Sequence, residues 1–225
     1  MMNELLWFAF LLLNFVLVLI MYKLFGKIGL FAWIAMGTVL ANIQVTKTIE
    51  IFTLTATLGN IMYGSLFLIT DTLNEKYGLK EAKKAVYIGF SSLIAMVLIM
   101  NMALWFIPHS DDFAHEALTT IFSLMPRIAL GSMLAYIVSQ LLDVHLFQKI
   151  KKTFHSDKTL YIRNLGSTLA SQLIDTLIFV PIAFLGIHEA SILINILITT
   201  YLIKLFVALL DTPFVYLMKR ITPLS

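Results

Sequence analysis

The stretch IALGSMLAYIVSQLLDV (residues 128–144) has a close counterpart in NLGSTLASQLIDTLIFVPIAFL (residues 164–185). Each carries one Ser-Gln-x-x-Asp unit among apolar residues; the units are Ser139, Gln140 and Asp143, and Ser171, Gln172 and Asp175. The glutamine and the aspartate of a unit share one helical face. A carboxylate or carboxamide in hydrocarbon is costly unless it has a partner or faces a polar cavity. Two such faces on consecutive helices therefore predict a polar pocket.

The composition is typical of a membrane protein. Of 225 residues, 60% are hydrophobic and 13% are charged, whereas an ordinary soluble domain has about 25% charged residues. We therefore expect an all-α fold, a polytopic transmembrane helical bundle that forms one domain over residues 1–225. The Lys and Arg residues lie at the ends of apolar segments rather than in a stripe with aromatic residues, which argues against nucleic acid as a partner. The absence of cysteine excludes disulfides and Cys-based metal sites.

Seven apolar segments approach or exceed the roughly 20 residues that a bilayer requires. We expect helices at residues 5–24, 28–44, 51–70, 83–106, 124–150, 164–185 and 192–218. The second is short and ends in polar residues, so it is either a full span or a broken, re-entrant helix, which gives six or seven spans. Lys and Arg are concentrated in alternate loops, and cytoplasmic loops hold the excess. The N-terminus is therefore expected outside and the C-terminus inside.

Polar side chains of the last three helices lie at comparable depth. With a rise of about 1.5 Å per residue, Gln140, Gln172 and Asp211 share one level, while Asp175 and Lys204 lie near the midplane. Lys204 shares a helix face with Asp211 and is within reach of Asp175 on the neighbouring helix. This layer is a buried ion pair that locks the bundle, a set of interhelical hydrogen bonds, or a ligand site. Carboxamides offer both donors and acceptors, which suits a planar polar ligand better than a metal ion, so neither a metal nor a cofactor is expected.

Further motifs surround the two units. They are Thr70-Asp71, Glu75-x-Tyr77-Gly78, Ala82, Gly89-Phe90, Arg127 and Arg163-Asn164, with Thr176 and Phe179 after the second unit and Asn42 and Lys47 before the first. On chemistry alone, residues 70–78 are a solvated loop and Arg127 is an interfacial residue. Together with the two units, these motifs resemble the queuosine precursor transporters of the vitamin uptake transporter group, over roughly residues 41–184.

The resemblance implies a secondary transporter of the bacterial inner membrane that imports 7-cyano-7-deazaguanine, 7-aminomethyl-7-deazaguanine or queuine for tRNA queuosine modification. The alternative is a substrate-binding membrane subunit of a multi-subunit ATP-driven uptake system. The expected partners are this small-molecule substrate and the lipid bilayer, and a homo-oligomer is left open. The resemblance and the polar layer together give these candidate substrate-binding residues: Asn42, Lys47, Asp71, Glu75, Arg127, Gln140, Asp143, Asn164, Gln172, Asp175, Lys204 and Asp211.

The chemistry of a deazaguanine fits such residues. Its ring N–H and amino group suit one carboxylate, Asp175 or Asp143, and its carbonyl suits an amide or Lys204. Asp175, Asp143 or Asp211 are candidates to carry a coupled proton. The chain has no H-E-x-x-H, G-x-S-x-G or phosphate-binding glycine loop, so we expect no enzyme. An intramembrane aspartyl protease, which needs two carboxylates that meet, and a purely structural scaffold remain as alternatives.

Overall fold

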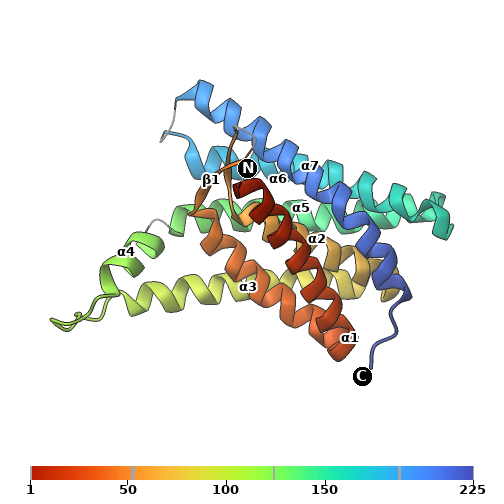
Figure 1. Ribbon diagram of the computed structural model, residues 1–225, viewed down its shortest axis with the longest axis horizontal. Coiled ribbons are helices and arrows are strands. Elements are labelled where there is room, and N and C mark those ends of the chain that lie inside the picture. The colour runs from red at the N-terminus through yellow and green to blue at the C-terminus, as the bar shows by residue number, and fades with distance from the viewer. Residues whose placement is uncertain (1, 52–53, 124, 187–188, 225) are drawn as a thin grey trace.

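The computed structural model describes residues 2–51, 54–123, 125–186 and 189–224, and most of these residues are helical (Figure 1). The helices are α1 (Met2–Val45), α2 (Gly59–Lys76), α3 (Leu79–Ala103), α4 (His115–Ser123), α5 (Met125–Thr153), α6 (Leu160–Phe184) and α7 (Ala190–Arg220), with a 3₁₀ turn at Asp157–Thr159. Within these residues, α1, α3, α5, α6 and α7 are long and apolar enough to cross a membrane. The expected all-α transmembrane bundle is confirmed.

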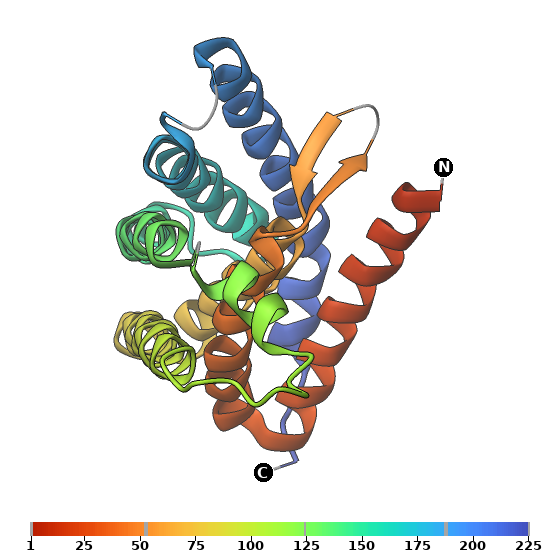
Figure 2. The same ribbon diagram turned by 90° about the vertical axis from the view of Figure 1, so that its left-hand side faces the viewer.

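Helix α1 is bent sharply into two arms. At Gly26, φ is 55° and ψ is −138°, a conformation that glycine adopts more readily than other residues. The arms 2–25 and 27–45 leave this turn as a V (Figures 1 and 2). They match the first two expected helices. Together with α2, α3, α5, α6 and α7, they make seven main helical segments in the described residues.

Hydrogen bonds place the two chain ends at opposite ends of the bundle. Asn3 Nδ2 donates to Glu50 O at 3.0 Å, whereas Lys23 Nζ donates to Thr222 O at 2.9 Å, close to the turn at Gly26. These contacts lie at the two ends of the second arm of α1, and Figure 2 shows the N and C ends well separated. We call the end that holds the C-terminus the inner end, in keeping with the charge distribution. That this end faces the cytoplasm stays a prediction.

The third expected helix, at residues 51–70, is wrong at both ends. Strand β1 (Thr48–Ile51) pairs antiparallel with β2 (Leu54–Thr57), and α2 begins only at Gly59. Threonine and isoleucine favour strands, which accounts for this hairpin. At its other end α2 continues to Lys76, so residues 70–76 are helical rather than a loop, because their polar side chains find partners inside the protein.

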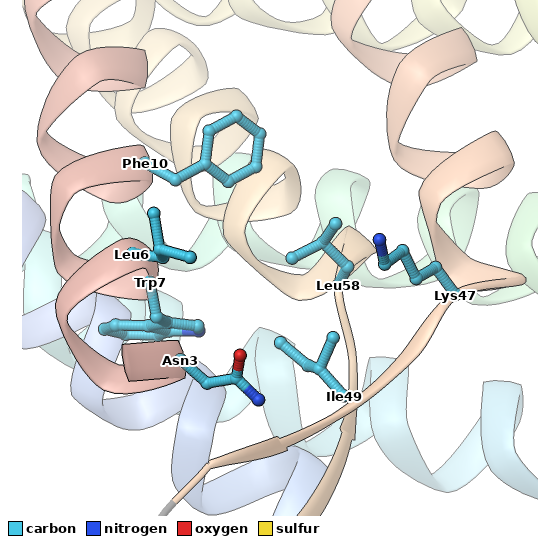
Figure 3. A pocket seen from close by; sticks show the side chains of 7 residues that line it. All are labelled: Asn3, Leu6, Trp7, Phe10, Lys47, Ile49 and Leu58. Carbon is cyan, nitrogen blue, oxygen red and sulfur yellow. The ribbon is translucent and has the colours of Figure 1, made fainter. Parts of the chain in front are cut away.

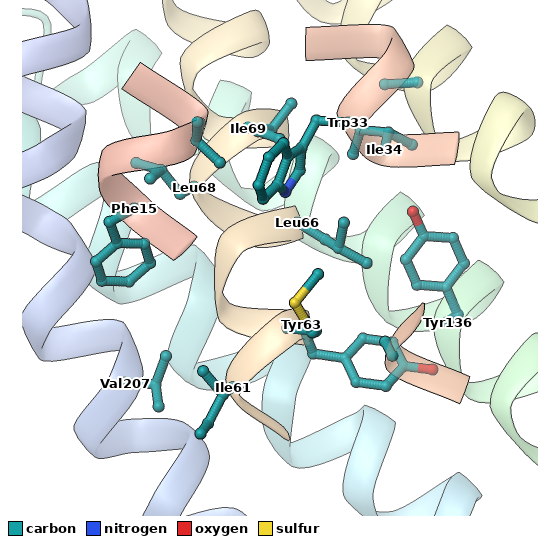
Figure 4. Close-up of a cluster of buried hydrophobic side chains, with 14 of the residues drawn as sticks. Phe15, Trp33, Ile34, Ile61, Tyr63, Leu66, Leu68, Ile69, Tyr136 and Val207 are labelled. Atoms are coloured by element: carbon teal, nitrogen blue, oxygen red, sulfur yellow. The ribbon is translucent and has the colours of Figure 1, made fainter. Parts of the chain in front are cut away.

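Helix α2 is the central element of the bundle. Every residue from Gly59 to Asn74 is buried, and α2 contacts α1, α3, α5 and α7. Phe15 and Trp33 of α1 and Val207 of α7 belong to the hydrophobic cluster around it (Figure 4). Trp33 Nε1 also donates to Ser65 Oγ of α2 at 3.2 Å. Because neighbouring helices enclose α2, it can carry polar side chains that a lipid-facing helix could not.

Gly64 sets the distance between α2 and α7. A Cβ atom at this position would overlap the side chain of Val207, and small residues allow membrane helices to approach closely. We expect Gly64→Ala to destabilise the protein by about 1–3 kcal/mol, the usual cost of overpacking a core. The melting temperature of the purified protein in detergent measures this loss.

Two further variants test the cause of the loss. In Gly166→Ala the new methyl group meets only the terminal methyl group of Ile150, at 3.1 Å, so this matched control should melt close to the wild type. Adding Val207→Ala to Gly64→Ala should recover part of the lost stability. A double variant that melts at or below the temperature of Gly64→Ala would contradict the proposed contact.

Candidate functional site

The two Ser-Gln-x-x-Asp units bind each other's aspartates. Ser139 Oγ on α5 donates to Asp175 Oδ1 on α6 at 3.0 Å, and Ser171 Oγ on α6 donates to Asp143 Oδ1 on α5 at 2.9 Å. All four residues are buried. Each aspartate thus accepts a hydrogen bond from the serine of the other unit.

Asp175 lines a small cavity between the helices, which we call the central cavity. Lys204 of α7 forms a buried ion pair with Asp175, and its Nζ lies 5.9 Å from the centroid of the Tyr63 ring of α2. Asn60 of α2 and Phe179 of α6 also border the cavity. Its volume is about 10 Å³, which is room for about one water molecule. A ligand larger than water would therefore need space that the Asp175–Lys204 pair now borders.

Side chains around the central cavity retain hydrogen-bonding capacity. Asn60 Nδ2 is buried and has no acceptor within the described residues. Asn42 Nδ2 donates to Tyr63 OH at 3.2 Å and to Thr38 O at 2.9 Å, while its Oδ1 has no donor among those residues. The site combines an anion, a cation, unused amide groups and two aromatic rings. This combination suits a flat polar heterocycle.

A second polar group lies nearer the inner end. It consists of three fully buried aspartates, Asp71 of α2, Asp143 of α5 and Asp211 of α7, which we call the acidic cluster. The carboxyl groups of Asp71 and Asp143 lie next to each other, because their donors on α6, Thr168 and Ser171, are one helical turn apart. Asn164 Nδ2 of α6 donates to Asp211 Oδ1 at 3.0 Å, and Thr168 Oγ1 donates to Asp71 Oδ2 at 3.4 Å. Across the described ranges, no group of three or more His, Cys, Asp or Glu side chains is arranged to hold a metal ion.

Glu75 ties four helices together at the inner end. Its carboxylate pairs with Arg163 of α6 at 2.9 Å, Lys151 of α5 at 3.1 Å and Lys219 of α7 at 2.8 Å. Arg163 is fully buried and also donates to Phe154 O at 2.7 Å. Glu75 was expected to bind substrate; the structure places it in this ion network and not in the lining of the central cavity.

Two other expected site residues lie elsewhere. Lys47 borders a surface groove of about 340 Å³ between the first arm of α1 and the hairpin, with Trp7 and Ile49 among its other lining residues (Figure 3). Arg127 Nε donates to Ile182 O at 2.9 Å, and its Nη2 donates to Leu185 O. Arg127 therefore satisfies carbonyl groups at the end of α6, which helices otherwise leave unpaired.

Most of the remaining expected residues lie in one of two places. Asp175 and Lys204 meet at the central cavity, and Asn42 is hydrogen-bonded to Tyr63 of its lining. Asp71, Asp143 and Asp211 form the acidic cluster, and Asn164 is hydrogen-bonded to Asp211. Gln140 and Gln172 are buried, and Gln140 has no hydrogen-bond partner for either amide atom within the described residues. Asn60 was missed by the sequence interpretation. Its signal was available, because an amide inside an apolar run needs a partner or a cavity.

Comparison with known proteins decides the family. A family model described as "Putative vitamin uptake transporter" matches residues 57–218. A Bacillus subtilis (strain 168) protein named "Probable queuosine precursor transporter" is 52% identical over 223 residues, which cover 99% of this chain and 97% of that protein. The chain belongs to the queuosine precursor transporter family. The Escherichia coli (strain K12) "Queuosine precursor transporter" is 28% identical over 146 residues, 64% of this chain and 62% of that protein. No solved structure matches the chain.

Membership of the queuosine precursor transporter family confirms several expectations. The protein is a multi-pass bacterial membrane protein, in agreement with its candidate spans. It is a transporter and not an enzyme. The roles of the individual candidate residues stay predictions, and the geometry now separates those at the central cavity from those in the acidic cluster and the inner ion network.

The inner ion network predicts a large stability effect. Glu75→Gln leaves the buried Arg163 without its anion, and breaking a buried pair costs about 3–5 kcal/mol. The side chain of Lys151 is 31% exposed, so Lys151→Gln should cost at most about 1 kcal/mol, as exposed pairs do. Melting temperatures in detergent compare the two variants. Equal losses of stability in the two variants would contradict the larger contribution expected from the buried Glu75–Arg163 pair.

Proposed function

We propose that the protein is a secondary transporter that imports a queuosine precursor, a 7-deazaguanine base, across the bacterial inner membrane. The observation that carries the proposal is the central cavity, where a carboxylate, an ammonium group and aromatic rings meet inside a bundle of membrane helices. The names of the related proteins support the substrate class. The same observation supports Asp175 as the centre of base recognition.

The edge of the base matches the polar groups of the central cavity. A 7-deazaguanine carries a ring N–H and an amino group side by side, and one carboxylate accepts both hydrogen bonds. Asp175 supplies that carboxylate. The neighbouring carbonyl of the base accepts from Lys204 or from Asn60 Nδ2, which has no acceptor within the described residues. Tyr63 and Phe179 offer faces or edges for the flat ring.

Substrate binding requires Lys204 to move. A cavity of about 10 Å³ holds about one water molecule and not a two-ring base. A base that hydrogen-bonds to Asp175 therefore takes the place of the Lys204 ammonium group. Because Asp175 is on α6 and Lys204 is on α7, this exchange of partners is coupled to a change in the packing of these two helices. Such a change is what alternating access around a central site requires.

The test is uptake by liposomes that contain only this purified chain, with labelled queuine, 7-cyano-7-deazaguanine and 7-aminomethyl-7-deazaguanine. Saturable uptake of at least one base is expected. Asp175→Asn should weaken binding at least about tenfold, since a hydrogen bond to a charged group contributes about 1.5–3 kcal/mol. Asp111→Asn, in an exposed outer loop, is the matched control and should bind like the wild type.

The other outcomes separate the alternatives. Tight binding without uptake would replace the secondary transporter with a substrate-binding subunit that needs ATP-hydrolysing partners. Wild-type affinity in Asp175→Asn would remove the central cavity as the recognition site. Neither binding nor uptake of any of the three bases by the wild-type protein would contradict the proposed substrate class.

A further inference from the structure

The acidic cluster contains a contact that requires a proton. The carboxyl groups of Asp71 and Asp143 are fully buried, and they lie next to each other because their donors on α6, Thr168 and Ser171, are one helical turn apart. An ionised carboxylate only accepts hydrogen bonds, so one member of such a pair must be protonated and donate. Two carboxylates that share one proton behave in this way in other proteins. The pair is therefore stable only while it holds a proton.

The surroundings of the pair are short of donors. Asp71 Oδ1, Asp143 Oδ2 and Asp211 Oδ2 have no donor among the described residues. Asn164, which is fully buried, uses its amide nitrogen on Asp211 and Thr212. Its carbonyl oxygen is left without a donor there. This unpaired acceptor beside the cluster is a second sign that the site lacks hydrogen-bond donors.

The cations nearby are bound to other groups. On α5, α6 and α7, Lys151, Arg163 and Lys219 pair with Glu75 of α2, and Lys204 pairs with Asp175. On α1 and α3, Lys27 pairs with Glu81 at 3.0 Å. The neighbours on α6 at the cluster, among them Thr168 and Ser171, are neutral. Protons are then the means by which the facing carboxylates of Asp71 and Asp143 are neutralised.

We propose that Asp71 and Asp143 form a proton-binding site, separate from the central cavity, and that this proton couples import to the proton gradient. The coupling rests on the proposed transport function, whereas the proton site does not. A proton enters from the outer side, is shared by the two carboxyl groups, and is released unchanged to the inner side with each base. Each cycle therefore moves one positive charge inward in addition to any charge on the base.

The helix contacts connect the proton site to the central cavity. With the proton present, Asp71 and Asp143 hold α2 against α5; without it, two like charges face each other in a medium of low dielectric constant and repel. Ser171 links Asp143 to α6, and Ser139 of α5 links to Asp175. A displacement of α5 on proton loss therefore changes the hydrogen bonding of the carboxylate that is proposed to bind the base.

The proton site is tested by infrared spectroscopy of the purified protein at neutral pH. A protonated carboxyl group has a C=O band that ionised carboxylates lack. We expect wild type minus Asp71→Asn, and wild type minus Asp143→Asn, each to show the loss of one such band. Asp175→Asn is the matched buried control; because Asp175 is paired with Lys204 and ionised, no such band should be lost. An unchanged band in both cluster variants would overturn the proton site.

The coupling is tested by base accumulation in liposomes with and without an inward proton gradient. A gradient of one pH unit is expected to raise wild-type accumulation up to about tenfold, the factor that one proton per base supplies. In Asp71→Asn and Asp143→Asn the ratio of accumulation with and without the gradient should fall to about one. Two variants are used because either one alone could fail to fold.

Each remaining outcome has a single meaning. Wild-type uptake that ignores the pH gradient, or that follows a sodium gradient, would overturn proton coupling while leaving the transport function intact. Gradient-dependent uptake that persists in both cluster variants would also overturn it. A wild-type protein that neither binds nor takes up any base would contradict the proposed function, while the infrared result would still decide whether the Asp71–Asp143 pair holds a proton.

Discussion

The structure depends on one constraint: a polar helix is enclosed in the middle of a membrane bundle, and its polar groups need partners inside the protein. Helix α2 is buried along nearly its whole length. Asp71, Asn74 and Glu75 follow one another along its inner half, and each contacts a different group on the surrounding helices. Because unpaired polar groups are costly in hydrocarbon, these contacts fix how α5, α6 and α7 pack around α2.

The two copies of one sequence unit have different surroundings, although the bonds between them are reciprocal. Ser139 donates one hydrogen bond to Asp175, and Ser171 donates one to Asp143. The second partner differs: Asp175 meets a lysine of α7, and Asp143 meets an aspartate of α2. One carboxylate thus lies in an ion pair with a lysine, while the other lies beside a second carboxyl group. The proposed binding site and the proposed proton site can lie on two adjacent helices for this reason.

Much of the fold was predictable, and the errors have specific causes. Hydrophobic runs located six of the seven main helical segments within a few residues, because the bilayer requires about 20 apolar residues from each. The third failed at both ends. Its apolar start is a β-hairpin, and its polar end, which includes Asp71 and Glu75, is helix rather than loop. Hydropathy assigns polar residues to water and cannot recognise a helix whose partners are other helices.

For the candidate site, the pattern of polar residues in apolar runs identified Asp175 and Lys204 as neighbours, and the structure confirms their contact. The same reasoning placed Asp211 on the face of Lys204, and it did not identify the partner of Asp211, which is the amide of Asn164. Glu75 and Arg127 were grouped with the substrate site. In the structure they lie at opposite ends of the bundle, where Glu75 pairs with Arg163 and Arg127 donates to Ile182 O. Spacing along one helix tells on which face of that helix a side chain lies, but it does not tell which neighbouring helix that side chain contacts.

By itself the sequence determined that the chain is a membrane bundle, that two similar polar units lie on consecutive helices, and that these motifs are those of a known transporter family. Each of these properties is local, because hydropathy and helical periodicity depend only on residues close together in the chain. Only the tertiary structure decided which aspartate faces Lys204 and which faces Asp71. That choice depends on the order in which α2, α5, α6 and α7 pack around one another, and residues from four distant segments settle it together.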